Sequence, residues 1–254
     1  MKRLLVLSGG HPYEAEPFAA LLASLAGWDV RHLVHPEAEE AVGAGALDGA
    51  DALLCYDMGG YEFGNGSLTV RPPSAAFKGS VKSFLERGGG IVAMHHALAG
   101  WATWPEWSEL LGGRFLYQPG EVRGGHVLDS GYRHEVAYEA AVVATHPVTA
   151  GLPPRFAVRD ELYLAEVFED EVVPLLRAQH SFVADNFYSA AHAVAGQMFD
   201  NHDWLHPPGS NLIAWERPMP NGRLVYLQPG DGPETYANSH VRRLLANALA
   251  HVAA

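Results

Sequence analysis

The sequence has little cysteine, no excess of positive charge and no long apolar run. Cys55 is the one cysteine among 254 residues, so no intrachain disulfide can form, and we expect a reducing, cytoplasmic location. Lys and Arg number 17 against 29 Asp and Glu, and the formal net charge of −12 argues against nucleic acid as a partner. The apolar run Leu4–Leu7 is too short for a signal peptide, and no stretch approaches the roughly 18 apolar residues of a membrane span. We therefore expect a soluble protein with no membrane partner.

Several well-known catalytic motifs are also missing. The sequence contains no Gly-x-Ser-x-Gly elbow, no phosphate-binding P-loop and no Gly-x-Gly-x-x-Gly fingerprint. Cys55 lies inside an apolar strand pattern, which is typical of a small buried residue rather than a reactive thiol. Cysteine-dependent glutaminase chemistry is therefore not expected.

The first half of the chain alternates strand and helix patterns. The composition, 48% hydrophobic and 18% charged, is that of a packed globular protein. Strands separated by helices indicate βαβ units, and hence a mostly parallel, doubly wound α/β sheet. The predicted strands are 3–8, 28–34, 52–56 and 91–94, and the predicted helices are 14–26, 74–87 and a segment through 107–111.

The second half is less regular. Strand patterns occur at 135–144, 212–216 and 223–227, and an apolar stripe predicts one final helix over 235–252. Turn-rich and aromatic-rich segments lie between them, with no convincing linker. We therefore expect a single domain, 1–254, with an irregular insertion at about 112–210 over the active edge of the sheet.

Histidines and acids follow several predicted strands. His11 follows the first strand, Asp57 the third and His95-His96 the fourth, while Asp231 comes soon after the strand at 223–227. Ligands of open α/β sheets bind outside the carboxyl ends of the strands, so these side chains are expected at one edge. Imidazoles and carboxylates together indicate a metal site or acid–base catalysis.

The segment Gly88–Ala97 has the pattern of a strand that turns sharply into a helix. Such an elbow presents one side chain over the sheet, and here that side chain is His95, a base or a metal ligand. Gly10 lies beside His11 and lets a ligand approach the backbone closely. His95 is therefore the leading catalytic candidate.

Ordered blocks of sequence resemble the ThuA-like (trehalose-utilisation) family. They cover most of the chain, and no single block is specific alone. The blocks are Leu5–Glu14 (LVLSGGHPYE), Gly88–Ala97 (GGGIVAMHHA), Trp107–Gly113 (WSELLGG), 146–152, Asp160–Tyr163 (DELY) and 221–226, which leads into Pro229-Gly230.

The resemblance implies a class I glutamine amidotransferase-like (flavodoxin-like) three-layer fold without the nucleophilic cysteine. It implies a carbohydrate-processing protein. We expect an enzyme that acts on a glycoside or keto-glycoside, with His95, His11 and Glu161 as catalytic residues. Asp160 is expected to face solvent. The alternative is a sugar-binding or regulatory module that has lost its chemistry.

A divalent metal is compatible with the strand-end residues. Zn²⁺ accepts imidazole and carboxylate ligands, and His11, His95 and Asp231 are the expected set. Asp231 stands where many relatives carry a histidine after Pro-Gly, and its carboxylate suits Zn²⁺ or Mn²⁺, with Zn²⁺ favoured.

A small carbohydrate is the expected partner. A homodimer is expected only because dimers are the commonest oligomers of soluble proteins. Trp101 and Trp104 either pack in the core or form a platform for a sugar ring. His146 is expected to be structural, and the pattern does not choose among His126, His134, His202 and His206. The expected substrate-binding residues are Gly10, Tyr13, Asp57, His96, Trp101 and Trp104.

Overall fold

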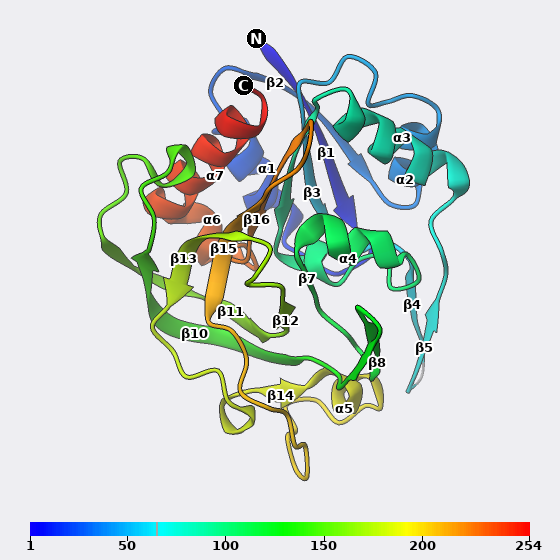
Figure 1. The fold of residues 1–254 in the computed structure, drawn as a ribbon, viewed down its shortest axis with the longest axis vertical. Helices are drawn as coiled ribbons and strands as arrows, with labels where there is room; N and C mark the ends of the chain where they lie inside the picture. The colour runs from blue at the N-terminus through cyan, green and yellow to red at the C-terminus, as the bar shows by residue number, and fades with distance from the viewer. Residues whose placement is uncertain (65) are drawn as a thin grey trace.

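A large mixed sheet with helices on both faces forms the centre of the computed structural model, which describes residues 1–64 and 66–254 (Figure 1). The strand order is β11-β10-β13-β15-β16-β6-β3-β1-β2, and β14 pairs with β10. The strands of this sheet are β1 (Lys2–Gly9), β2 (Trp28–Val34), β3 (Ala52–Asp57), β6 (Gly90–Met94), β10 (Gly131–Val142), β11 (Arg155–Leu164), β13 (Val173–Ala178), β14 (Tyr188–Ser189), β15 (Leu212–Arg217) and β16 (Arg223–Leu227).

Five neighbouring strands of the sheet are parallel and form the predicted α/β core: β2, β1, β3, β6 and β16. Side chains of β1 alternate between two hydrophobic clusters, because successive residues of a strand point to opposite faces. Leu4 and Val6 pack with α1 and α7, whereas Leu5 and Leu7 pack with α2 and α3. The three-layer α/β prediction is therefore confirmed. These helices are α1 (Ala15–Ala23), α2 (Glu37–Gly43), α3 (Ala75–Glu86) and α7 (Ser239–Val252).

The other half of the sheet is antiparallel. Strands β15, β13, β10 and β11 continue the sheet from β16, and each pairs antiparallel with its neighbour. Much of the segment expected to be irregular is thus built from strands. The β10–β11 pair lies beside the carboxyl ends of the parallel strands, and its His134 and Glu161 lie at the site (Figure 1).

Shorter elements connect the larger ones, and several were not predicted, including α2 and the hairpin β4–β5. The prediction of a single final helix over 235–252 was wrong, because Asn238 separates two helices. Its side chain accepts hydrogen bonds from the backbone N–H groups of His240 and Val241 and thereby caps α7. The shorter elements are β4 (Tyr61–Gly64), β5 (Ser67–Val70), α4 (Pro105–Leu111), β7 (Gly113–Arg114), β8 (Gly120–Val122), β9 (Gly125–Val127), β12 (Glu166–Val167), α5 (Ala190–Val194), α6 (Pro233–Ala237) and the 3₁₀ turns His95–Leu98, Pro147–Thr149 and Ala184–Asn186.

In the part of the chain that the structure describes, no helix combines the length and the apolar character needed to cross a membrane.

Candidate active site

A sharp turn after β6 presents His95. The strand ends at Met94, and His95 begins a 3₁₀ turn with a φ of 48°, in the left-handed region that non-glycine residues seldom adopt. The hydroxyl of Tyr226 on β16 donates a hydrogen bond to the His95 carbonyl at 3.1 Å and supports this backbone. The imidazole is fully buried. The local conformation is that of the predicted elbow.

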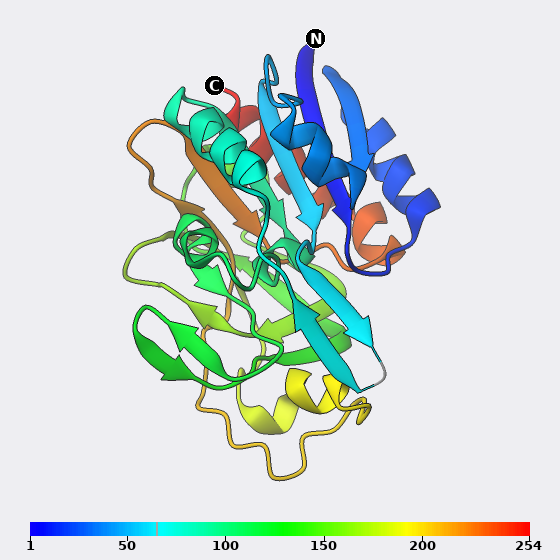
Figure 2. The same ribbon diagram turned by 90° about the vertical axis from the view of Figure 1, so that its right-hand side faces the viewer.

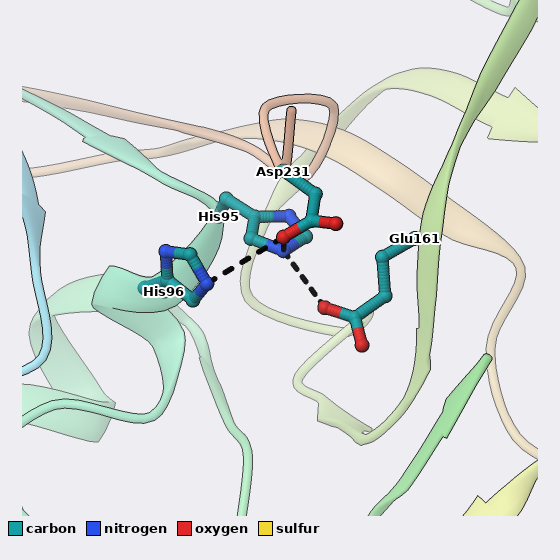
Figure 3. Close-up of side chains that lie close together, drawn as sticks. All are labelled: His95, His96, Glu161 and Asp231. Carbon is teal, nitrogen blue, oxygen red and sulfur yellow. Dashed lines mark hydrogen bonds and ion pairs between the residues drawn. The ribbon is translucent and has the colours of Figure 1, made fainter. Parts of the chain in front are cut away.

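The hydrogen bonds of His95 define which ring nitrogen faces the site. Its Nδ1 lies 2.6 Å from the carbonyl oxygen of Gln228, which only accepts hydrogen bonds, so Nδ1 carries a proton. Its Nε2 lies 3.0 Å from Glu161 Oε2 and 3.5 Å from Asp231 Oδ1 (Figure 3). It also lies 2.7 Å from the Tyr163 hydroxyl. A lone pair facing two carboxylates would be repelled, so the two carboxylates favour a positive charge at Nε2. The charge is either a second proton or a metal ion.

The charge environment of His95 favours the protonated form when no metal is bound. Burial by itself lowers the pKa of His95. The hydrogen bond to Glu161 and the charge of Asp231 outweigh burial and raise that pKa to about 9. His95 is therefore an imidazolium at neutral pH.

Asp160 anchors the loop that delivers Asp231. Its carboxylate accepts hydrogen bonds from the backbone N–H groups of Gly230, at 2.6 Å, and Asp231, at 3.0 Å. The expectation that Asp160 faces solvent was wrong: it is 5% exposed, since the loop after β16 lies against its carboxylate. Asp160 thus acts by positioning the loop after β16, while Glu161, the next residue of β11, faces His95.

His11 and His96 form a stacked pair beside His95. Their ring centroids are 4.1 Å apart. The Nδ1 of His11 donates to the carbonyl of Pro12 at 2.9 Å, which leaves Nε2 as an acceptor. Burial lowers the pKa of His11 and lowers that of His96 well below its ordinary value, with the nearby His95 adding to both effects. Both rings are neutral at pH 7.

His134 is the fourth histidine of the site. The register of β10 and β11 shifts between Arg133 and Val136, and such a bulge re-aims the side chains beside it. His134 Nδ1 lies 3.2 Å from Glu161 Oε1 and 3.8 Å from Asp231 Oδ2. The Asp231 carboxylate raises the pKa of His134, more than its partial burial lowers it.

Four of these residues could hold a metal ion. One ligand atom from each lies within 4.8 Å of the others: His95, His96, Glu161 and Asp231. The buried Nε2 of His96 has no hydrogen-bond partner among the described residues and lies 3.7 Å from Asp231 Oδ1 (Figure 3). The Nδ1–H of His95 bonds to a carbonyl, as is usual for a metal-ligating histidine. The group differs from the expected ligand set, because His96 and Glu161 belong to it and His11 stacks beside it.

A polar cavity of about 610 Å³ opens over this group. Its lining includes His11, Tyr13, Glu161 and Asp231, four of the residues singled out from the sequence. The other lining residues are Pro12, Glu14, His134, Glu135, Arg159, Asp160, Gly232, Pro233, Glu234 and Thr235.

Four residues expected to bind substrate do not line the polar cavity. Asp57 is 2% exposed and pairs with His35 at 2.9 Å. Gly10 has a φ of 80°, and a Cβ there would lie 2.1 Å from the Met58 carbonyl oxygen, so the glycine permits a close crossing of two backbone segments. Trp101 and Trp104 are each 1% exposed within the core, which contradicts the sugar-platform interpretation in favour of its packing alternative.

Trp101 is expected to matter for stability rather than for sugar binding. It packs against Phe77, and a Cβ at Gly59 would lie 2.2 Å from its ring. Trp101→Ala should lower the free energy of unfolding by about 3–5 kcal/mol, because it leaves a large cavity. Trp101→Phe should cost less, since the indole Nε1 makes no hydrogen bond within the described residues. Chemical denaturation measures both; a stable Trp101→Ala protein that has lost only its affinity for sugar would contradict the packing role.

A second group of His and Glu side chains lies away from the elbow. His146 Nε2 and His251 Nε2 lie 2.8 and 2.9 Å from the two carboxylate oxygens of Glu216. His146 Nδ1 accepts a hydrogen bond from the backbone N–H of Val148, so the proton of the neutral ring resides on Nε2 and points at Glu216. This tautomer suits a structural clamp between a 3₁₀ turn, β15 and α7, in agreement with the structural role expected for His146.

The place of Tyr163 in the site and the positioning role of Asp160 were not predicted from the sequence. The sequence pattern also did not identify His134 as the histidine that joins the site. Tyr163 stands two residues after Glu161 on β11 and therefore points to the same face. That alternation was available as a signal, but the strand itself was not predicted. The bulge that aims His134 has no sequence pattern of its own.

Comparison with solved structures supports the fold. A ThuA-like protein from Parabacteroides merdae is 15% identical, with a TM-score of 0.69 over 99% of this chain and 90% of that one. Another from Bacteroides uniformis is 19% identical, with a TM-score of 0.62 over 97% and 89%. A glutamine amidotransferase from Thermotoga maritima is 10% identical, with a TM-score of 0.51 over 99% and 98%. No curated protein matches the sequence. The family model described as ThuA, trehalose utilisation, matches residues 3–252, and the chain therefore belongs to the ThuA family.

Proposed function

We propose that this protein is a carbohydrate-processing enzyme that acts on a glycoside or keto-glycoside by histidine-based acid–base or metal-assisted chemistry. The observation that carries the proposal is the pair of carboxylates facing His95 Nε2, at 3.0 Å from Glu161 and 3.5 Å from Asp231. The trehalose-utilisation family supports a sugar as the substrate.

Without metal, His95 and His11 supply an acid and a base. His11 lines the polar cavity, and His95 lies directly behind Glu161 and Asp231 of that lining. The pKa of His95 is raised to about 9 by Glu161 and Asp231 against the effect of burial, so its Nε2 holds a proton to donate. The pKa of His11 is lowered by burial, so its Nε2 is free to accept one. Environments that push the pKa values of neighbouring groups apart mark acid and base roles. His95 therefore acts as the acid, and not as the base expected from the sequence, while His11 acts as the base and Glu161 holds the His95 proton in place.

A metal ion suits the same residues. Zn²⁺ would be held by His95, His96, Glu161 and Asp231, and when bound it would polarise a substrate oxygen as a Lewis acid. The imidazole and carboxylate set favours Zn²⁺ over Mn²⁺.

We do not expect glutaminase activity. Cys55, the chain's one cysteine, is 2% exposed within β3. Burial raises the pKa of its thiol well above the ordinary value, and a thiol held in its neutral form is a poor nucleophile.

A substrate panel tests the proposal against a non-catalytic sugar-binding module. Purified protein, with and without added Zn²⁺, is incubated with disaccharides, simple glycosides and their keto forms, and the products are followed by NMR. The proposal expects conversion of at least one glycoside or keto-glycoside, lost in His95→Gln. Saturable heat of binding in calorimetry with sugar that stays unchanged would overturn it in favour of the binding module.

A further inference from the structure

A second cavity, lined mainly by aromatic and aliphatic side chains, adjoins the polar one. It has a volume of about 300 Å³ and shares His11, Pro12, His134 and Glu161 with the polar cavity. Phe63 of β4 and Ala193 and Val194 of α5 belong to its lining. The β4–β5 hairpin and α5 lie near each other in the fold (Figure 2). The apolar lining residues are Phe63, Phe115, Tyr117, Tyr132, Tyr163, Ala193, Val194 and Met198.

The tyrosines of this cavity have their hydroxyl groups engaged with the protein. The Tyr163 hydroxyl lies 2.7 Å from His95 Nε2. The Tyr117 hydroxyl donates to the sulfur of Met58 at 3.4 Å, and that of Tyr132 accepts from the backbone N–H of Phe199 at 3.0 Å. A sugar placed here would bury hydroxyl groups without partners, which is unfavourable. An apolar ring would bury none.

We propose that the aromatic cavity is a subsite for an apolar aglycone, so that the preferred substrates are glycosides of aromatic or similarly apolar alcohols rather than sugars linked to sugars. This inference rests on the proposed function. The polar cavity, with Arg159, Glu234 and Thr235, offers hydrogen-bonding groups for the sugar. Since the two cavities meet at His11, His134 and Glu161, the bond between sugar and aglycone lies over the histidines.

The size of the cavity agrees with this assignment. A cavity of about 150 Å³ is enough to hold benzene, so about 300 Å³ accepts a substituted aromatic ring. Ala193 on α5 is half-buried in its wall and leaves room that a larger side chain would fill. Ala195, two residues on, is exposed and does not line the cavity. The two positions provide a test variant and its matched control.

Calorimetry with methyl and phenyl glucosides and their keto forms tests the subsite, with turnover measured alongside. The phenyl compound should bind about 30–100-fold more tightly than the methyl compound, from the apolar area that it buries. Ala193→Phe should abolish this preference and leave the affinity for the methyl compound unchanged within about twofold. Ala195→Phe should behave as the wild type, and Val194→Phe provides a second blocked cavity if Ala193→Phe does not fold.

The outcomes separate the two proposals. Turnover of methyl and phenyl compounds with equal affinity, unaffected by Ala193→Phe, would overturn the aglycone subsite and leave the enzymatic function standing. Tight binding of the phenyl compound without turnover of any glycoside would support the subsite and overturn the enzymatic function. Failure of every compound to bind would overturn the aglycone subsite, while the wider substrate panel decides the enzymatic function.

Discussion

Replacement of His95 by glutamine is expected to lower turnover of the glycoside or keto-glycoside substrate by about 10²–10⁴-fold, the usual contribution of a general acid or base. Glutamine preserves much of the length and polarity of the side chain but cannot carry a proton at neutral pH. The variant should still fold, because its amide can replace part of the hydrogen bonding to Gln228 and Glu161. The measurement is kcat and KM, with the thermal unfolding transition recorded for the same sample.

His146→Gln is the matched control for this experiment. His146 also pairs with a glutamate, at 2.8 Å from Glu216, but lies outside both cavities. It should therefore leave kcat unchanged within about twofold, well below the effect of losing an acid–base group. Full turnover by His95→Gln, with or without metal, would remove His95 from the mechanism.

The pH dependence of turnover follows from the same residue. A group that acts as an acid must be protonated, and the pKa of His95 is raised to about 9 by Glu161 and Asp231 against burial. Turnover by the metal-free enzyme should therefore be retained at neutral pH and should fall as pH rises through about 9. A pH–rate profile of kcat/KM measured in the presence of EDTA checks this sign.

The arrangement of His11, His95 and Asp231 could be predicted because each follows a parallel strand. Side chains at the carboxyl ends of such strands meet at one edge, whatever their separation in sequence. The rule also has a limit, shown by Asp57. It stands at the end of β3 as expected, yet its side chain pairs with His35, which packs against Trp101, because the rule places the backbone and not the direction of the side chain.

The remainder of the site comes from the antiparallel half, where periodicity carried less information. Glu161 was singled out from a family motif, whereas its strand β11 was not predicted. The backbone shift that aims His134 is a bulge, and the burial of Asp160 depends on the loop that it holds. The tryptophan spacing at 101 and 104 fitted both a core and a binding surface, and only tertiary packing could decide between them.

The protein is expected to bind Zn²⁺ with the release of at least one proton at pH 7. One comes from His95, and any further one comes from His134, which lies beside the ligands Glu161 and Asp231. In the metal-free protein His95 is protonated, with a pKa raised to about 9 by Glu161 and Asp231 against burial, and its Nε2 must lose that proton to become a ligand. His96 adds no proton, because burial holds its pKa well below the ordinary value and its ring is already neutral. Asp231 adds none either, since its pKa is lowered, chiefly by His134 acting against burial.

The affinity for Zn²⁺ should therefore rise at least about tenfold for each pH unit between 7 and about 9 and then level off, as expected when one or more protons compete with the metal. Calorimetric titration in buffers of different ionisation enthalpy counts the protons directly and does not depend on activity. Asp231→Asn should weaken binding by about 10–100-fold or more, as a perturbed ligand set does, while His146→Gln should leave the affinity unchanged. Affinity that is independent of pH between 7 and 9, or equal in wild type and Asp231→Asn, would place the metal elsewhere and leave His95 as an acid that works by proton transfer alone.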